Sequence, residues 1–165
     1  MKTKMVFTFV ILILTGLVMV AIILFHPKGI SNRISKDASL VECIKTAEEY
    51  LQQNQPGSSI YPLLLAVQKD QRDFMAHLLL AQAYFRTDIY PLAEKECQTS
   101  LELNPQNREA AELLCQIKLV QGKSRWERED YLPAISEFMY VLKESRDQKL
   151  IDSIAQLTGG RFKIQ

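Results

Sequence analysis

An uncharged apolar stretch near the N-terminus constrains the fold of this chain more than any other feature. It runs from Met5 to Phe25 and contains no Asp, Glu, Lys or Arg. At 1.5 Å per residue, about 21 helical residues reach about 32 Å, which matches the hydrocarbon core of a bilayer. The stretch is apolar on every face, unlike the amphipathic helix of a globular domain. We therefore predict a single transmembrane helix, with residues 1–25 as a membrane anchor.

A cleaved signal peptide is the competing interpretation of this stretch. Lys2 and Lys4 precede it, but the stretch is too long for a signal peptide and no small-residue cleavage site follows it. Its far end is also basic, with Lys28, Arg33 and Lys36, so the charges at the two ends favour opposite orientations. Because the first residues resemble a signal n-region, we predict a single-pass membrane protein with a cytoplasmic N-terminus and an extracytoplasmic domain.

The charge beyond the anchor limits the classes of partner. All 19 acidic residues and 18 of the 20 basic residues follow Phe25, which leaves a net charge near −1. Proteins that bind nucleic acid neutralise phosphates with clustered Lys and Arg. We therefore predict no nucleic-acid partner.

The remaining sequence predicts an all-α domain. Residues 26–37 form a linker, and Ser39 and Glu42 have the spacing of a capping box that starts a helix. Apolar residues then recur with the helical period in segments of about 10 to 15 residues. No segment of useful length alternates apolar and polar residues with the period of two that is typical of a strand. Ser59, Asp88 and Asp130 each stand three residues before a Pro and are predicted N-caps. A second capping box at Ser124–Glu127 predicts a separate helical turn.

Residues 74–107 carry a pattern of small and apolar residues that suits two packed antiparallel helices. Small side chains let the helices approach, and a proline ends the second helix. The residues of the pattern are Leu80, Ala81, Tyr84, Ala93, Cys97, Ser100, Asn104 and Pro105. This pattern resembles a tetratricopeptide repeat (TPR), a 34-residue helical hairpin. His77 and Cys97 replace the usual Trp and Phe, so this copy is lightly packed.

Weaker copies flank this hairpin at the same 34-residue offset. The third copy contains a seven-residue insertion, which is two helical turns and keeps the apolar face in register. Residues 147–158 form an amphipathic helix that Gly159 and Gly160 end. The predicted fold is an N-terminal transmembrane helix followed by about three TPR-like antiparallel hairpins and a C-terminal capping helix. The repeat domain covers residues 38–158, and residues 159–165 are a tail.

No constellation in the sequence supports catalysis. The two histidines, His26 and His77, lie far apart, and His77 is interpreted as a packing residue. The three cysteines lack CxxC spacing and read as small buried hydrophobes. A Cys97–Cys115 disulfide is the alternative in an oxidising compartment. No phosphate loop, nucleophile elbow or paired-carboxylate motif occurs. We predict a protein that is not an enzyme, with no catalytic residue, metal or cofactor.

The resemblance implies a concave groove, lined by the first helix of each hairpin, that binds a peptide or helix of another protein. Ile44 and Glu48 stand where TPR domains that bind acidic chaperone tails carry Lys and Asn, so an acidic tail is disfavoured. Carried over copy by copy, the resemblance assigns these residues to the lining: Val41, Ile44, Glu48 and Leu51, then Met75, Leu78, Gln82, Phe85 and Arg86, then Glu109, Glu112, Gln116, Leu119 and Val120.

The predicted function is that of a membrane-anchored scaffold that binds an apolar or amphipathic segment of a partner protein. The alternative is a structural subunit of a membrane complex that acts through its transmembrane helix, and the membrane contact in both cases is made by residues 5–25. Met75, Leu78 and Phe85 share one face of a helix whose other face is also apolar. Either a partner segment or a helix of the same chain, such as residues 150–157, must cover that face.

Overall fold

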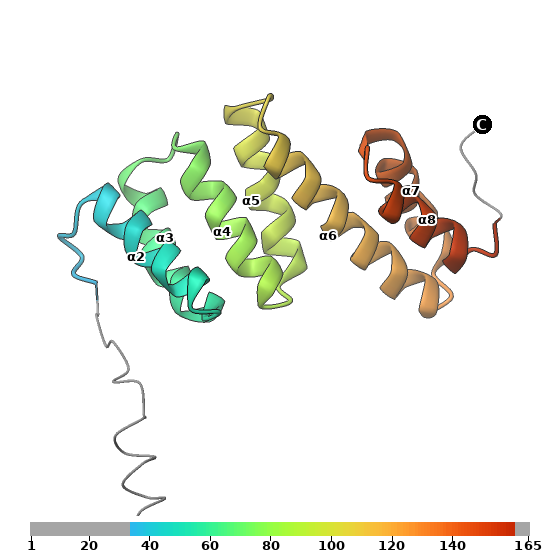
Figure 1. The fold of residues 1–165 in the computed structure, drawn as a ribbon, viewed down its shortest axis with the longest axis horizontal. Helices are drawn as coiled ribbons and strands as arrows, with labels where there is room; N and C mark the ends of the chain where they lie inside the picture. Colours follow the sequence, from blue (N-terminus) through green and yellow to red (C-terminus); the bar gives the residue numbers. More distant parts are fainter. Residues whose placement is uncertain (1–33, 161–165) are drawn as a thin grey trace, which may run out of the picture. The chain divides into compact units, whose positions relative to one another are not determined.

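The computed structural model describes residues 34–160, and in this part of the chain all regular structure is α-helical (Figure 1). Seven helices follow one another with short connections. They are α2 (Leu40–Gln52), α3 (Pro56–Lys69), α4 (Phe74–Arg86), α5 (Tyr90–Leu103), α6 (Arg108–Glu127), α7 (Tyr131–Glu144) and α8 (Gln148–Leu157).

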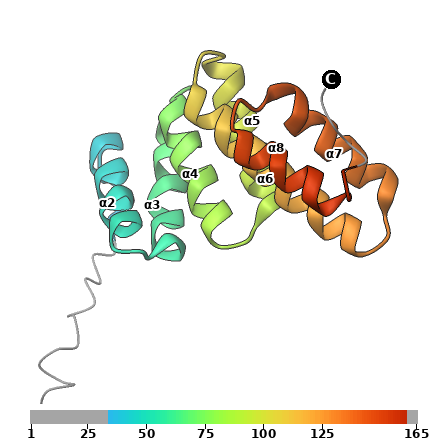
Figure 2. The ribbon, with the colours of Figure 1, turned by 45° about the vertical axis from the view of Figure 1, so that its right-hand side comes forward.

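The helices form three antiparallel hairpins and one further helix. α2 packs on α3, α4 on α5 and α6 on α7, and the hairpins stack through α3 on α4 and α5 on α6. The first helices of successive hairpins also touch, α2 with α4 and α4 with α6, whereas α8 packs against α6 and α7 (Figure 2). The hairpin array and the capping helix are therefore present as predicted.

Small residues form the helix contacts of the central hairpin. Ala81 of α4 and Ala93 and Cys97 of α5 are fully buried, as is Ser100 one turn further along α5. The Ser100 hydroxyl donates a hydrogen bond to the carbonyl oxygen of Phe74 at 2.9 Å, so it ties the end of α5 to the start of α4. The predicted close approach of these two helices is confirmed.

The helix starts follow the predicted caps only in part. Ser39 and Glu42 form the predicted capping box of α2, with both hydrogen bonds at 3.2 Å. Ser59 is not an N-cap, because α3 begins at Pro56 and the buried Ser59 hydroxyl bonds to the Pro56 carbonyl at 2.7 Å. Proline suits the first helical position since its φ is already fixed there. Pro62 therefore lies inside α3, which has 14 residues, and not in its first turn.

The third hairpin accommodates its insertion by lengthening its first helix. α6 has 20 residues, against 13 in α2 and in α4, and it runs through Ser124 without a break. The predicted separate turn at Ser124–Glu127 is therefore wrong: no breaker interrupts the segment, and two extra turns preserve the buried face. Gly122 lies against α7, where an added Cβ would be 2.6 Å from a ring carbon of Phe138.

The predicted membrane-spanning part of the fold and the single-pass localisation need correction. Within residues 34–160, no helix is long and apolar enough to cross a membrane. Each of these helices contains buried residues, and α4 is buried over most of its length. The stretch Met5–Phe25, on which the anchor and its orientation were based, lies outside the described residues. The fold established for the described part is an all-α helical array.

Candidate functional site

The structure divides the predicted groove residues into exposed, half-buried and buried sets. Glu48, Met75, Arg86, Glu112 and Gln116 are exposed, and Ile44, Gln82, Phe85 and Leu119 are half-buried. Two of the predicted residues, Leu51 and Leu78, are buried in the main core at 8% and 1% exposure. These two leucines therefore belong to the core beneath the surface and are not available to contact a partner.

Two polar links join the first helices of successive hairpins across this surface. The Gln82 amide donates to the Glu109 carboxylate at 2.7 Å, which joins α4 to α6. Arg86 donates to the Leu51 carbonyl at 3.0 Å and to the Asn54 side-chain oxygen at 2.9 Å, which joins α4 to the end of α2. These links satisfy backbone and side-chain groups and fix the spacing of α2, α4 and α6.

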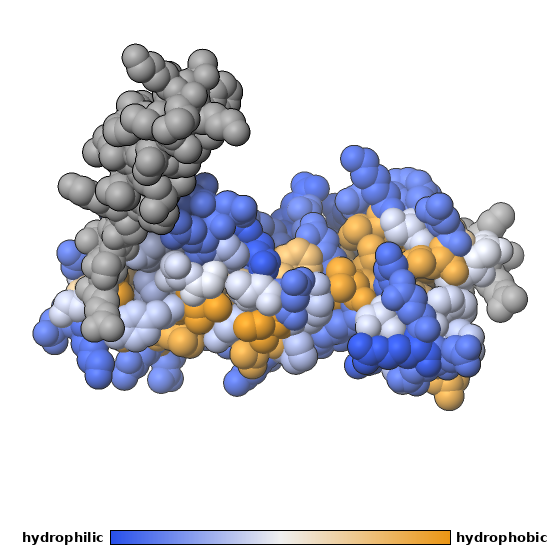
Figure 3. Space-filling model, turned by 90° about the horizontal axis from the view of Figure 1, so that it is seen from below, coloured by the Kyte–Doolittle hydropathy of each residue, from blue (hydrophilic) through white to orange (hydrophobic). Residues whose placement is uncertain are grey.

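Apolar side chains remain exposed near the N-terminal ends of α2 and α4. Val41 is 74% exposed and Met75 is 39% exposed. Phe85, near the other end of α4, packs partly on the core and meets the Tyr90 ring edge-on with centroids 5.9 Å apart. Figure 3 shows one face of the molecule, on which hydrophobic surface occurs in separate patches divided by hydrophilic surface. Since α8 packs against α6 and α7, it is not the helix that covers α4.

A cleft of about 680 Å³ lies between the start of α6 and the junction of α7 with α8. It contains the predicted groove residues Glu112 and Gln116, and the buried thiol of Cys115 contributes to its wall. Its lining comprises Pro105, Gln106, Asn107, Arg108, Ala111, Glu112, Cys115, Gln116, Glu144, Ser145, Arg146, Asp147 and Leu150. The sequence pattern indicated two of these residues but not the cleft, which depends on where α8 starts.

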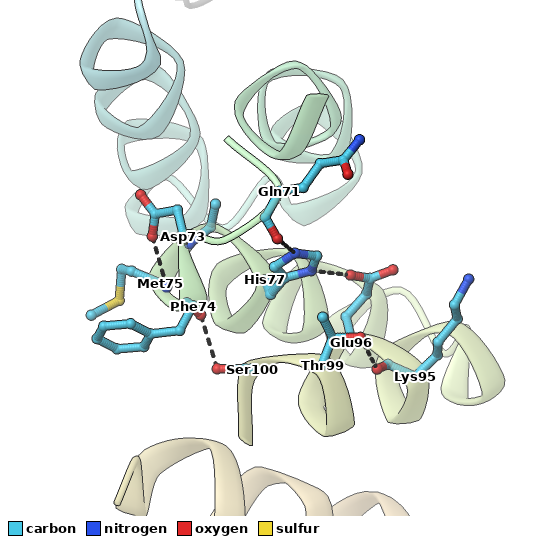
Figure 4. Close-up of polar contacts among 10 residues, drawn as sticks. Gln71, Asp73, Phe74, Met75, His77, Lys95, Glu96, Thr99 and Ser100 are labelled. Carbon is cyan, nitrogen blue, oxygen red and sulfur yellow. Dashed lines mark hydrogen bonds and ion pairs between the residues drawn. The ribbon is translucent and has the colours of Figure 1, made fainter. Parts of the chain in front are cut away.

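His77 is buried as predicted, but it is also a polar link (Figure 4). Its Nδ1 lies 2.6 Å from a carboxylate oxygen of Glu96, and its Nε2 lies 3.2 Å from the carbonyl oxygen of Gln71. The carbonyl oxygen of Gln71 can only accept, so Nε2 is the donor in that hydrogen bond. Asp73 caps α4 beside it by accepting from Met75 N–H at 2.8 Å. These contacts hold the start of α4 against α5.

A second buried polar cluster joins three helices around Lys118. Its ammonium group lies 2.6 Å from Glu94 of α5 and 2.9 Å from Glu137 of α7, and Arg125 also meets Glu137 at 2.9 Å. Burial acts to lower the pKa of Lys118, but the hydrogen bonds to both carboxylates outweigh it and the pKa is raised. Lys118 replaces the Tyr of the repeat pattern, which was the only signal of this cluster in the sequence.

The cysteines and the tryptophan have packing roles. Cys43, Cys97 and Cys115 are free and buried. Burial raises the pKa of the Cys97 thiol to about 12, so this thiol is protonated at neutral pH and weakly nucleophilic. Trp126 is half-buried in the third core cluster and meets Tyr131 edge-on with centroids 4.8 Å apart. In residues 34–160, no group of three or more His, Cys, Asp or Glu side chains is placed to hold a metal ion.

Solved structures identify the fold. The first TPR domain of Spaghetti (RPAP3), bound to the HSP90 peptide SRMEEVD, matches with a TM-score of 0.53 and 16% identity over 73% of this chain and 90% of that one. This chain has a tetratricopeptide-repeat fold. MamA matches this TPR array with a TM-score of 0.58 and 19% identity over 74% of this chain and 70% of that one. The N-terminal domain of C. elegans STI-1 matches with a TM-score of 0.53 and 17% identity, over 72% of this chain and 94% of that one.

The sequence comparisons add nothing to this assignment. No protein-family model matches the sequence, and no curated protein sequence matches it. At 16 to 19% identity the likeness to the solved structures establishes the fold. The resemblance of residues 74–107 to a TPR is thus confirmed from the structure.

Proposed function

We propose that this TPR array is a protein-interaction adaptor that binds an apolar or amphipathic segment of another protein on the surface formed by α2, α4 and α6. The observation that carries the proposal is the exposure of Val41 and Met75 on the first helices of two adjacent hairpins. TPR domains of RPAP3 with the same fold are bound to peptides of HSP90 and HSP70. A partner that covers an exposed apolar side chain gains about 25 cal/mol for each Å² removed from water.

The polar residues of the surface argue against an acidic tail as the partner. Glu48 is exposed on α2, and Arg86 already donates to Leu51 and Asn54. An incoming carboxylate would therefore meet a like charge on α2 and an arginine that must first give up two hydrogen bonds. These features support a segment that binds through apolar contacts, which matches the helix-in-groove mode of recognition.

The test is selection of peptides from a random displayed library by the full-length chain, followed by measurement of Kd for the selected peptides by fluorescence anisotropy. Met75→Glu places a charge on the proposed surface without filling the core, and it should raise Kd tenfold or more, about 1.4 kcal/mol. Leu92→Glu on α5 is the matched control, because Leu92 is 42% exposed against 39% for Met75. Equal loss of binding in both variants, or none in either, would contradict the proposed surface.

A further inference from the structure

The outer face of α7 differs from that of α5, although the two helices occupy equivalent places in successive hairpins. Their buried residues correspond, since the fully buried Ala93 and Cys97 of α5 stand 41 positions before the fully buried Ala134 and Phe138 of α7. The exposed outer residues at the same offset are Pro91, Lys95, Gln98 and Glu102 in α5, and Leu132, Ser136, Met139 and Lys143 in α7. The polar outer face of α5 is therefore replaced in α7 by a more apolar one.

The four outer residues of α7 form one surface, which we call the α7 stripe. Their spacing of four, three and four residues places them on one side of the helix. Leu132 is 83% exposed and Met139 is 53% exposed, and the half-buried Ile135 lies beside them. Within residues 34–160, α7 packs against α6 and α8 and against no other helix (Figure 2), so the array leaves the α7 stripe uncovered.

We propose that the α7 stripe is the contact surface between two copies of this chain, paired with their α7 helices antiparallel. Such a contact is two-fold symmetric, so both copies contribute the same residues. Pairing about the middle of the stripe places the small Ser136 of each copy opposite the long Met139 of the other. It also places each Leu132 beside the methylene stem of Lys143 in the second copy. This surface is separate from the one formed by α2, α4 and α6, and the inference does not depend on the proposed function.

The charges at the two ends of the α7 stripe favour a second copy as the occupant. Lys143 ends the stripe, is its only charged residue, and has a side chain that is 82% exposed. The turn before the stripe, residues 127–130, contains three acids and one arginine, and its exposed Glu129 and Asp130 make no ion pair among the described residues. Antiparallel pairing brings Lys143 of each copy toward these acids of the other. The contact of Lys143 with the adjacent Glu144 at 3.1 Å is an exposed pair that contributes little, so it does not prevent this exchange.

The length of α7 sets the expected strength of the dimer. The helix has 14 residues, which corresponds to about 21 Å. Two single helix faces of this length bury less than the standard protein–protein interface of about 1,600 Å². We therefore expect a weak dimer that forms reversibly with concentration and whose orientation is set by the charges at the ends of the stripe.

Sedimentation velocity of the full-length chain over a series of concentrations measures the dimer Kd. Leu132→Gln with Met139→Gln makes the α7 stripe polar and should raise Kd tenfold or more. The matched control, Leu64→Gln with Leu92→Gln, replaces apolar side chains that are 46% and 42% exposed on α3 and α5, and it should leave Kd unchanged. Far-UV circular dichroism confirms that each variant is folded. Association through any other part of the chain would be the same in all of these variants.

Charge exchange tests the antiparallel arrangement. Lys143→Glu alone and Asp130→Lys alone should each raise Kd, because each places like charges opposite each other in both halves of the dimer. The Asp130 side chain makes no capping hydrogen bond to α7, so its replacement does not remove a cap. An equimolar mixture of the two variants should form a heterodimer with about the wild-type Kd, because each variant supplies the charge that the other requires.

The outcomes decide between a second copy and another occupant. A wild-type chain that stays monomeric at every concentration, or a dimer that the glutamine variants of the α7 stripe leave unchanged, would overturn the inference. A monomeric chain that binds a different protein through Leu132 and Met139 would assign the surface to that protein instead. Failure of the mixed charge variants to restore the dimer would refute the antiparallel pairing.

Discussion

Gly122→Ala should destabilise the repeat domain although it places a better helix former in a helix interior. The substitution alone gains about 0.5–1 kcal/mol, because Ala loses less backbone entropy than Gly. The new Cβ would lie 2.6 and 2.9 Å from two ring carbons of Phe138 and 3.1 Å from the Glu137 Cβ. Phe138 is fully buried, so its ring cannot swing into solvent. Overpacking of this kind costs about 1–3 kcal/mol.

The net expectation is a loss of about 1 kcal/mol, equivalent to a decrease in Tm of about 3–6 °C for a domain of this size. Urea unfolding followed by far-UV circular dichroism measures the loss. Fluorescence of Trp126, whose ring centroid lies 6.0 Å from that of Phe138, reports the local packing.

Gly57→Ala is the matched control for this prediction. It is also in a helix, but nothing lies within 4 Å of its added Cβ, so it should be neutral or slightly stabilising. Adding Phe138→Leu should make room for the methyl group, and a double-mutant cycle should give a coupling of at least about 0.5 kcal/mol. If Gly122→Ala is as stable as Gly57→Ala, α6 and α7 do not approach each other as closely as described.

Two further substitutions and one labelling experiment test the core. Ala93→Leu should cost about 1–3 kcal/mol because Ala93 is fully buried, and an unchanged Tm would refute that packing. Lys118→Met should cost about 3 kcal/mol at pH 7, since it removes the cation from Glu94 and Glu137. The pKa of Lys118 is raised above 10.5. The difference in free energy of unfolding between wild type and Lys118→Met, measured in urea, should therefore be complete below that pH and decline above it. Cys97, with a pKa of about 12, should react with maleimide at pH 8 only on unfolding, and rapid labelling of folded protein would contradict this.

The sequence predicted the hairpins because their contacts depend on residue size at fixed spacing. Ala81 and Ala93 are recognisable from the local pattern, and their burial follows from the packing of any two helices built around them. The starts of helices were less predictable. Pro56 and Pro62 are both acceptable first-turn residues, so local rules alone could not decide which of them begins α3.

The candidate site was only partly predictable, because exposure depends on how the helices cross. Leu51 and Leu78 occupy groove positions in the repeat pattern but lie in the core. The pairs His77–Glu96 and Lys118–Glu94 join residues 19 and 24 positions apart. No spacing rule for a single helix relates residues at such distances, so these pairs were visible only in the folded structure.

The charge cluster around Lys118 makes this array less modular than a series of interchangeable repeats. Its two carboxylates come from successive hairpins, Glu94 from the second and Glu137 from the third. Excision of residues 74–107 would join α3 directly to α6 in the correct repeat register, yet it would remove Glu94 and leave Glu137 as the one remaining carboxylate partner of Lys118 described above. The second and third hairpins are therefore expected to unfold as one unit.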